Sequence, residues 1–117
     1  MDNSKQSPTS DYKIIPFVLS LPDNHIGYYE IVKPERSIDM RSGFVTLHFG
    51  EDVGSHTTGK REELLIVLEG VGEVQIENHE SKKIQPRSVV YIPPNTCHNV
   101  FNMGENPLKY IYVVSGV

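Results

Sequence analysis

Two of the five histidines lie among residues whose types and spacing suit metal chemistry. His56 lies six residues after Gly50 and seven before Glu63, and His98 lies five residues after Pro93. Imidazole nitrogens and carboxylate oxygens bind divalent transition metals when they converge from different strands. A metal bound in this way acts as a Lewis acid or as an oxygen activator. This chemistry depends on the elements that carry the residues.

Short β-strands are the elements expected to position them. From Lys13 onward, runs rich in Val, Ile, Tyr and Phe alternate with turns of glycine, proline, asparagine and aspartate, which break every candidate helix. Many short strands at regular spacing indicate a sandwich or a barrel. The predicted strands are Ile14–Leu19, Tyr28–Val32, Phe44–Phe49, Leu64–Leu68, Glu73–Ile76, Ser88–Ile92, His98–Phe101 and Leu108–Val114.

The strand that follows Glu63 is apolar on both faces. Side chains alternate across a strand, so Glu63, Leu65 and Val67 share one face, while the other face consists of leucine and isoleucine. A strand of this kind is covered on both faces. One cover is the barrel interior; the other is a second subunit or an N-terminal strand of the same chain. The pattern favours a homodimer.

Composition limits the class of protein. The chain has 117 residues, enough for one domain, and its 11 basic and 15 acidic side chains give a net charge of −4. This net negative charge does not favour binding to nucleic acid or to an anionic membrane. No apolar run approaches the roughly 20 residues of a membrane span, and a single cysteine allows no internal disulfide. We expect a cytoplasmic protein with a mobile N-terminal arm at residues 1–12 and one domain at 13–117.

The spacing around His56 resembles the first motif of the cupin superfamily. That motif reads glycine, five residues, His-x-His, three or four residues, glutamate, six residues, glycine. In this chain Gly50, His56, Glu63 and Gly70 match it, and Thr58 replaces the second histidine.

The region around His98 resembles the second cupin motif, which reads glycine, five residues, Pro-x-Gly, two residues, His, three residues, Asn. Pro93, His98 and Asn102 match, whereas Arg87 and Asn95 replace the two glycines. Asparagine is a mild replacement because it tolerates the left-handed backbone conformation. The resemblance covers residues 25–115 and implies an all-β fold, the cupin-type double-stranded β-helix or jelly-roll barrel, as a single domain.

The resemblance implies a metal site formed by His56, Glu63 and His98. Two histidines and one carboxylate with open positions form the ligand set of non-haem Fe(II) oxygenases, and Mn, Ni, Co or Zn also suit it. Thr58 can hydrogen-bond a metal-bound water but is a poor direct ligand, because its neutral hydroxyl binds weakly. A buried Glu63 within an apolar strand face needs such a cation, or an ion pair with Arg61.

The other histidines carry weaker signals. His25 and His79 lie in polar, turn-like stretches and are interpreted as ordinary polar residues. On a strand, Phe44, Thr46 and His48 share one face. If that face points into the barrel, His48 is a candidate fourth ligand; otherwise it is an exposed or core histidine.

Three further residues lie in or near the motifs. Arg61 is a candidate to bind a carboxylate or phosphate of a substrate, with a solvated charge cluster as the alternative. Alternation places Asn102 on the same side as His98, which makes it a second substrate-binding candidate. Cys97 then points the opposite way and is interpreted as a small buried hydrophobic residue.

Three functions remain open at this point. The first is a metal-dependent enzyme that acts on a small polar molecule by oxygenation, isomerisation or lyase chemistry. The second is a metal-free cupin that binds or senses a small molecule without turnover. The third, less favoured, is a structural partner of another protein. Fold alone does not distinguish them, because one fold hosts many reactions.

Overall fold

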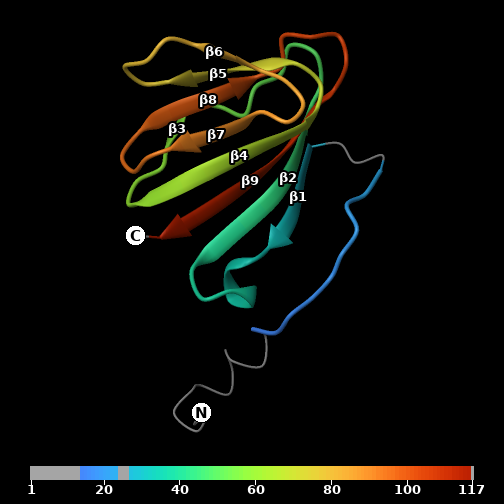
Figure 1. Ribbon diagram of the computed structural model, residues 1–117, viewed down its shortest axis with the longest axis vertical. Helices are drawn as coiled ribbons and strands as arrows, with labels where there is room; N and C mark the ends of the chain where they lie inside the picture. Colours follow the sequence, from blue (N-terminus) through green and yellow to red (C-terminus); the bar gives the residue numbers. More distant parts are fainter. Residues whose placement is uncertain (1–13, 24–26, 117) are drawn as a thin grey trace, which may run out of the picture.

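The computed structural model describes residues 14–23 and 27–116, which fold into two antiparallel β-sheets (Figure 1). Within these residues the only helical element is η1 (Pro34–Arg36), a 3₁₀ turn between the first two strands. The larger sheet has the order β1 (Gly27–Val32), β2 (Met40–Leu47), β9 (Leu108–Gly116), β4 (Arg61–Glu69) and β7 (Val89–Ile92). The smaller sheet has the order β3 (His56–Thr57), β8 (Cys97–Phe101), β5 (Gly72–Ile76) and β6 (Lys82–Ile84).

The inner faces of the two sheets form one hydrophobic core. The core cluster joins Leu65 and Tyr110 of the larger sheet to Val74, Ile84 and Val100 of the smaller sheet. Strands far apart in the sequence lie side by side, since β2 and β4 both pair with β9 near the C-terminus. The chain therefore has the predicted all-β, single-domain jelly-roll architecture.

Alternation along β4 sets which side chains face the core. Glu63, Leu65 and Val67 are all buried. Leu64 and Ile66 point to the other face and are only half-buried. The predicted division of this strand into two faces is thus confirmed.

Most of the predicted strands are present, but the one at Ile14–Leu19 is wrong. This segment is extended without strand pairing and is exposed, with Val18 99% accessible (Figure 1). Its apolar composition resembles a strand, but within the described residues no sheet edge pairs with it, and Pro16 has no N–H to donate to a neighbouring strand.

The strands β3 and β6 were missed because they are only two and three residues long and mostly polar. The predicted arm at residues 1–12 and His25 lie outside the described residues.

Backbone strain is concentrated where residues replace the glycines of the second motif. Arg87 and Asn95 both have positive φ, 78° and 55° respectively. Asn95 tolerates this conformation, as expected, whereas a long side chain such as that of Arg87 is disfavoured in it. Gly70, at φ 85°, has a further constraint, because a Cβ there would collide with the carbonyl oxygen of Pro107.

We predict that Arg87→Gly stabilises the domain. Relief of about 1–2 kcal/mol of left-handed strain is partly offset by the larger unfolded-state entropy of glycine. The net gain in the free energy of unfolding should be about 0.5–1 kcal/mol, or a few degrees in Tm. Chemical and thermal unfolding measure it, and Asn95→Gly is the matched control with a smaller expected effect. An unchanged or lowered Tm for Arg87→Gly would contradict the assignment of strain.

None of the described residues forms a helix that is long and apolar enough to cross a membrane.

Candidate metal centre

His56, Glu63 and His98 converge at one end of the barrel interior. His56 of β3 lies directly opposite His98 of β8, and their ring centroids are 4.2 Å apart at a tilt of 59°. Glu63 reaches the same point from β4 in the facing sheet. One ligand atom from each of the three residues lies within 4.8 Å of the other two, so the cluster could hold a single ion. Among the described residues it is the only group of this kind.

The two imidazole rings are oriented by backbone carbonyls. Nδ1 of His56 donates a hydrogen bond to the carbonyl of Gly54 at 2.9 Å, and Nδ1 of His98 donates to the carbonyl of Thr96 at 3.1 Å. A carbonyl only accepts, so Nδ1 carries the proton in each ring and Nε2 is left for a ligand. Metal-binding histidines generally have their second nitrogen held in this way. The histidines therefore fit a metal in tautomer as well as in position.

The contact between His98 and Glu63 requires a proton or a metal ion between the two side chains. Nε2 of His98 lies 2.9 Å from Oε1 of Glu63, and the two side chains are only 1% and 9% exposed. With Nδ1 already a donor, an unprotonated Nε2 would place its lone pair against the carboxylate. A proton on Nε2 or a metal ion between the two groups resolves the repulsion. Burial lowers the pKa of His98, but the hydrogen bonds to Glu63 and Thr96 and the charge of Glu63 outweigh it, so the pKa is raised overall.

A cavity of about 460 Å³ opens onto the cluster. This volume lies within the range of small-molecule sites. His56 is exposed at the cavity wall, whereas His98 and Glu63 are buried. Burial raises the pKa of Tyr110 and of Tyr112, so both phenols stay neutral at ordinary pH. The cavity is lined by Tyr28, Arg41, Val45, Val53, His56, Thr57, Thr58, Arg61, Glu63, Tyr110, Tyr112 and Val114.

The two additional ligand candidates lie in different places. Thr58 lines the cavity, but its hydroxyl donates to the carbonyl of Pro93 at 2.7 Å and accepts from the Thr96 N–H at 3.1 Å. The Thr58 side chain therefore links its own loop to the 93–96 loop and does not act as a metal ligand candidate. His48 is not part of the cluster; it is exposed one residue beyond β2. The face of β2 that carries Val45 points into the barrel, so the structure agrees with the alternative interpretation of His48 as an exposed histidine.

The substrate-binding candidates require one correction. Arg61 lines the cavity, as predicted, but its guanidinium is paired with Asp39 at 3.1 Å. Asn102 does not line it. Its side chain is fully buried and donates to the carbonyls of Leu47 and Asn106. Asn102 shares the inward direction of His98, but lies deeper in the core, where it anchors the turn before β9.

The prediction that Cys97 is buried is wrong. Cys97 points away from His98, as alternation requires, but it is exposed. The outer face of the smaller sheet has no covering layer within the described residues, so pointing away from the core means pointing to solvent. Sequence patterns give the direction of a side chain but not what lies beyond it.

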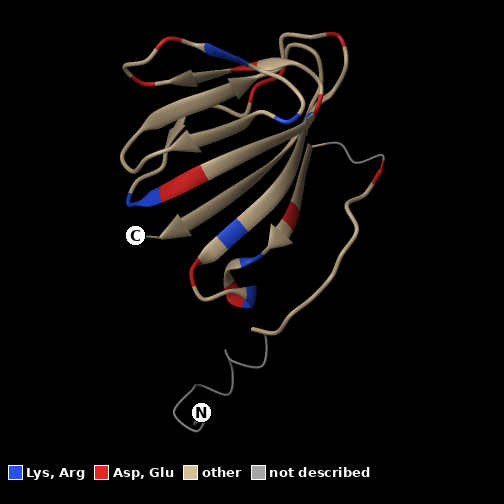
Figure 2. Ribbon diagram, in the orientation of Figure 1, with Lys and Arg blue, Asp and Glu red and all other residues tan. Residues whose placement is uncertain are grey.

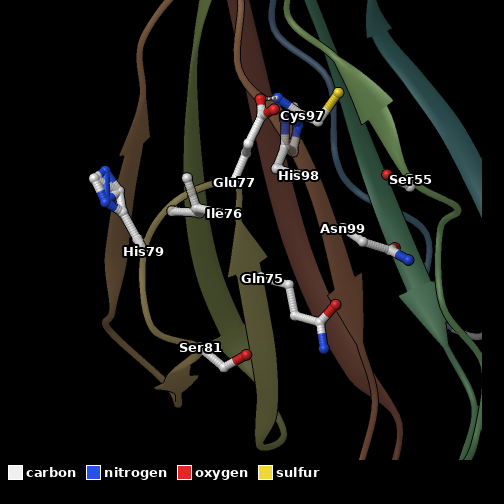
Figure 3. Close-up of a pocket in the computed structure, with 9 residues that line it drawn as sticks. All are labelled: Ser55, Gln75, Ile76, Glu77, His79, Ser81, Cys97, His98 and Asn99. Carbon is white, nitrogen blue, oxygen red and sulfur yellow. Dashed lines mark hydrogen bonds between the residues drawn. The ribbon is translucent and has the colours of Figure 1, made fainter.

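A second hollow, of about 330 Å³, lies beside Cys97 and is also lined by His98 and Ile76 (Figure 3). Glu77 accepts a hydrogen bond from the Cys97 backbone N–H at 3.2 Å, while the ring of His79 lies apart from both residues. These residues form no group that converges on one point. The hollow therefore lacks the geometry of a metal site.

Arg41 and the tyrosine pair Tyr28 and Tyr112 complete the cavity wall. Arg41 was missed in the sequence, where its polar surroundings gave no signal; its place in the alternating row with Gly43 and Val45 would have indicated it. Gly43 leaves room for the Tyr112 ring, because a Cβ there would lie 2.6 Å from Cε2 of Tyr112. The rings of Tyr28 and Tyr112 stack at 5.9 Å and their hydroxyls are hydrogen-bonded.

Comparison with known proteins identifies the family. A family model described as Cupin domain matches residues 43–114, more than half of the chain. The chain belongs to this family. Among solved structures, BH2720 from Bacillus halodurans aligns with a TM-score of 0.78 and 24% identity over 92% of this chain and 86% of that one. At this identity the likeness shows the fold.

Two curated proteins are similar in sequence. The chain is 38% identical over 50 residues to the uncharacterized protein MJ1618 of Methanocaldococcus jannaschii, covering 43% of this chain and 39% of that protein. It is 30% identical over 90 residues to the mannose-1-phosphate guanylyltransferase RfbM of Salmonella typhimurium, covering 77% of this chain and 18% of the relative. The chain thus spans less than half the length of both relatives.

We predict a pH-dependent stability in metal-free protein. The pKa of His98 is raised in the folded chain. Its contact with Glu63 therefore stabilises the fold fully below about pH 6.5, the ordinary histidine value, and this contribution is lost as the pH rises through the raised pKa. Urea unfolding in a chelator, from about pH 5.5 to about 8.5, measures it. His98→Gln should remove this part of the profile. Identical pH profiles for the two proteins would contradict the prediction.

Proposed function

We propose that the protein is a small metal-dependent enzyme acting on a small polar molecule. A divalent transition metal would be held by Nε2 of His56, Nε2 of His98 and a carboxylate oxygen of Glu63. The observation that carries the proposal is the convergence of these atoms, within 4.8 Å of one another, beside a cavity of about 460 Å³. The orientation of both rings by carbonyls supports it.

Residues of this chain would bind and orient the substrate. His56 is the exposed member of the cluster, so a ligand entering the cavity would approach from its side. The apolar walls, including Val45 and Val114, would exclude water from the reacting groups. When bound, the metal would supply Lewis acidity or, with a redox-active ion, oxygen activation. Oxygenation, isomerisation and lyase chemistry are the reaction classes to screen.

A metal-free binding or sensing protein is the second candidate. The observation that favours it is the direct contact of His98 with Glu63, which satisfies both groups once His98 is protonated. In that case the same cavity would bind a small molecule without turnover.

Elemental analysis of the purified protein separates the two candidates. We expect stoichiometric metal in the wild type and a loss of affinity of at least about 100-fold in His98→Ala and Glu63→Gln. Removing a group that only supports a ligand already costs about 10–100-fold. His48→Ala is the matched control, because it removes a histidine outside the cluster and should retain the metal.

Absence of metal from the wild type, even after anaerobic reconstitution with Fe, Mn, Ni, Co and Zn, would overturn the metalloenzyme proposal. The metal-free candidate would then stand. Equal loss of metal in His48→Ala would show that the cluster has been assigned wrongly.

We also propose that the chain forms a homodimer. The segment Ile14–Leu19 is extended and carries exposed apolar side chains, with Ile15 55% accessible. Phe17 is held beneath the Arg36 guanidinium, 4.8 Å from the ring centroid. An apolar segment held in this way is suited to cover a second copy of the chain.

Sedimentation equilibrium tests the dimer. Val18→Asp should raise the dimer dissociation constant by at least about tenfold, because it places a charge in the proposed contact. Met103→Asp, at an exposed apolar residue in the turn before β9, is the control and should leave association unchanged. A wild type that is monomeric at high concentration would contradict the proposal.

A further inference from the structure

Arg41 lies in the same row of the inner sheet face as Glu63. Arg41 is paired with Val114 in the register of β2 and β9, and Val114 is paired with Glu63 in the register of β9 and β4. Neighbouring strands are about 4.8 Å apart, so the backbones of Arg41 and Glu63 are separated by about 10 Å across the cavity. The cavity thus has the acid-histidine cluster at one end and a basic residue two strands away in the same sheet.

The two arginines of the cavity differ in whether the guanidinium has an ion-pair partner. Arg61 is paired with Asp39. Arg41 is exposed and has no ion pair or hydrogen bond within residues 14–23 and 27–116. Figure 2 shows one basic band on β2, the strand in which Arg41 is the only basic residue. The carboxylate of Glu30, on the adjacent strand opposite Gly43, makes no ion pair with Arg41. Arg41 is therefore free to bind an anion.

A largely apolar wall lies beside Arg41, in the neighbouring row of the larger sheet. Tyr28 and Tyr112 stack with an interplanar angle of 12°. Val45, Val53 and Val114 line the same space. Such a surface suits the body of a planar or apolar ligand.

We propose that Arg41 is the anion-binding residue of this site and that the ligand is a planar carboxylic acid. Its carboxylate pairs with the Arg41 guanidinium, which matches the fork geometry of carboxylates. Its body lies against the Tyr28–Tyr112 wall, and donor atoms at its other end face His56, Glu63 and His98. This inference rests on the proposed function for the donor end, whereas the role of Arg41 does not depend on a metal.

A matched pair of probes tests the inference on the full chain loaded with Zn²⁺, which has no redox chemistry. 3,4-Dihydroxybenzoate carries a catechol, which chelates metals, opposite a carboxylate; 3,4-dihydroxybenzamide has the same shape without the charge. Calorimetric titration should give a dissociation constant at least about tenfold lower for the acid in the wild type. In Arg41→Gln the dissociation constants of the acid and the amide should be about equal. Arg41→Lys should retain part of the preference for the acid, because lysine keeps the positive charge but lacks the two parallel N–H donors of the guanidinium.

Lys82→Gln is the control variant and should keep the preference for the acid, because Lys82 is an exposed basic residue of β6 that does not line the cavity. Zinc content and thermal unfolding, measured for every variant, separate loss of the anion contact from loss of the metal or the fold. An unchanged acid-to-amide ratio in folded, zinc-loaded Arg41→Gln would overturn the inference while leaving the proposed function intact.

Should the wild type bind no zinc, the proposed function fails, and Arg41 is then tested on the metal-free chain. Benzoate against benzamide replaces the catechol pair. A preference for benzoate that disappears in Arg41→Gln supports the anion site, and equal binding of the two probes overturns it.

Discussion

The buried carboxylate of Glu63 is the constraint on which the site depends. It shares one face of β4 with the apolar residues Leu65 and Val67. It also contacts His98, whose other ring nitrogen already donates a hydrogen bond to a carbonyl. An unpaired charge in such a place is expensive, so a proton or a metal ion must lie between the two residues. Since Glu63 belongs to one sheet and His98 to the other, their contact also links the two halves of the sandwich.

Thr58, which replaces the second histidine of the first motif, forms hydrogen bonds that hold the loop before His98. The hydroxyl of Thr58 joins its loop to the backbone of Pro93 and Thr96, next to Asn95 in its left-handed conformation. The loop that carries His98 is thus held by hydrogen bonds instead of by an additional ligand. Three side chains that could hold a metal remain, and a metal bound by three residues would keep positions open to a small molecule.

The wall of the cavity depends on a glycine that lies beside a large aromatic residue in the larger sheet. Gly43 allows the Tyr112 ring to lie over β2 and reach Tyr28. In the next row, Arg41 remains unpaired while Arg61 is neutralised by Asp39. The site therefore combines polar groups with an apolar wall, a division set by register and not by any one residue.

The sequence by itself determined the strand content, the two faces of β4 and the residues of the acid-histidine cluster, because strand alternation and motif spacing are local properties of the chain. Only the tertiary structure decided which face of β2 points inward, and hence that Arg41 lines the cavity while His48 does not. It also decided that Cys97 is exposed, that Asn102 lies in the core and that Ile14–Leu19 forms no strand. The physical reason is that alternation fixes only relative directions. Strand pairing and the layers above each sheet determine what a side chain meets, and these depend on residues distant in sequence.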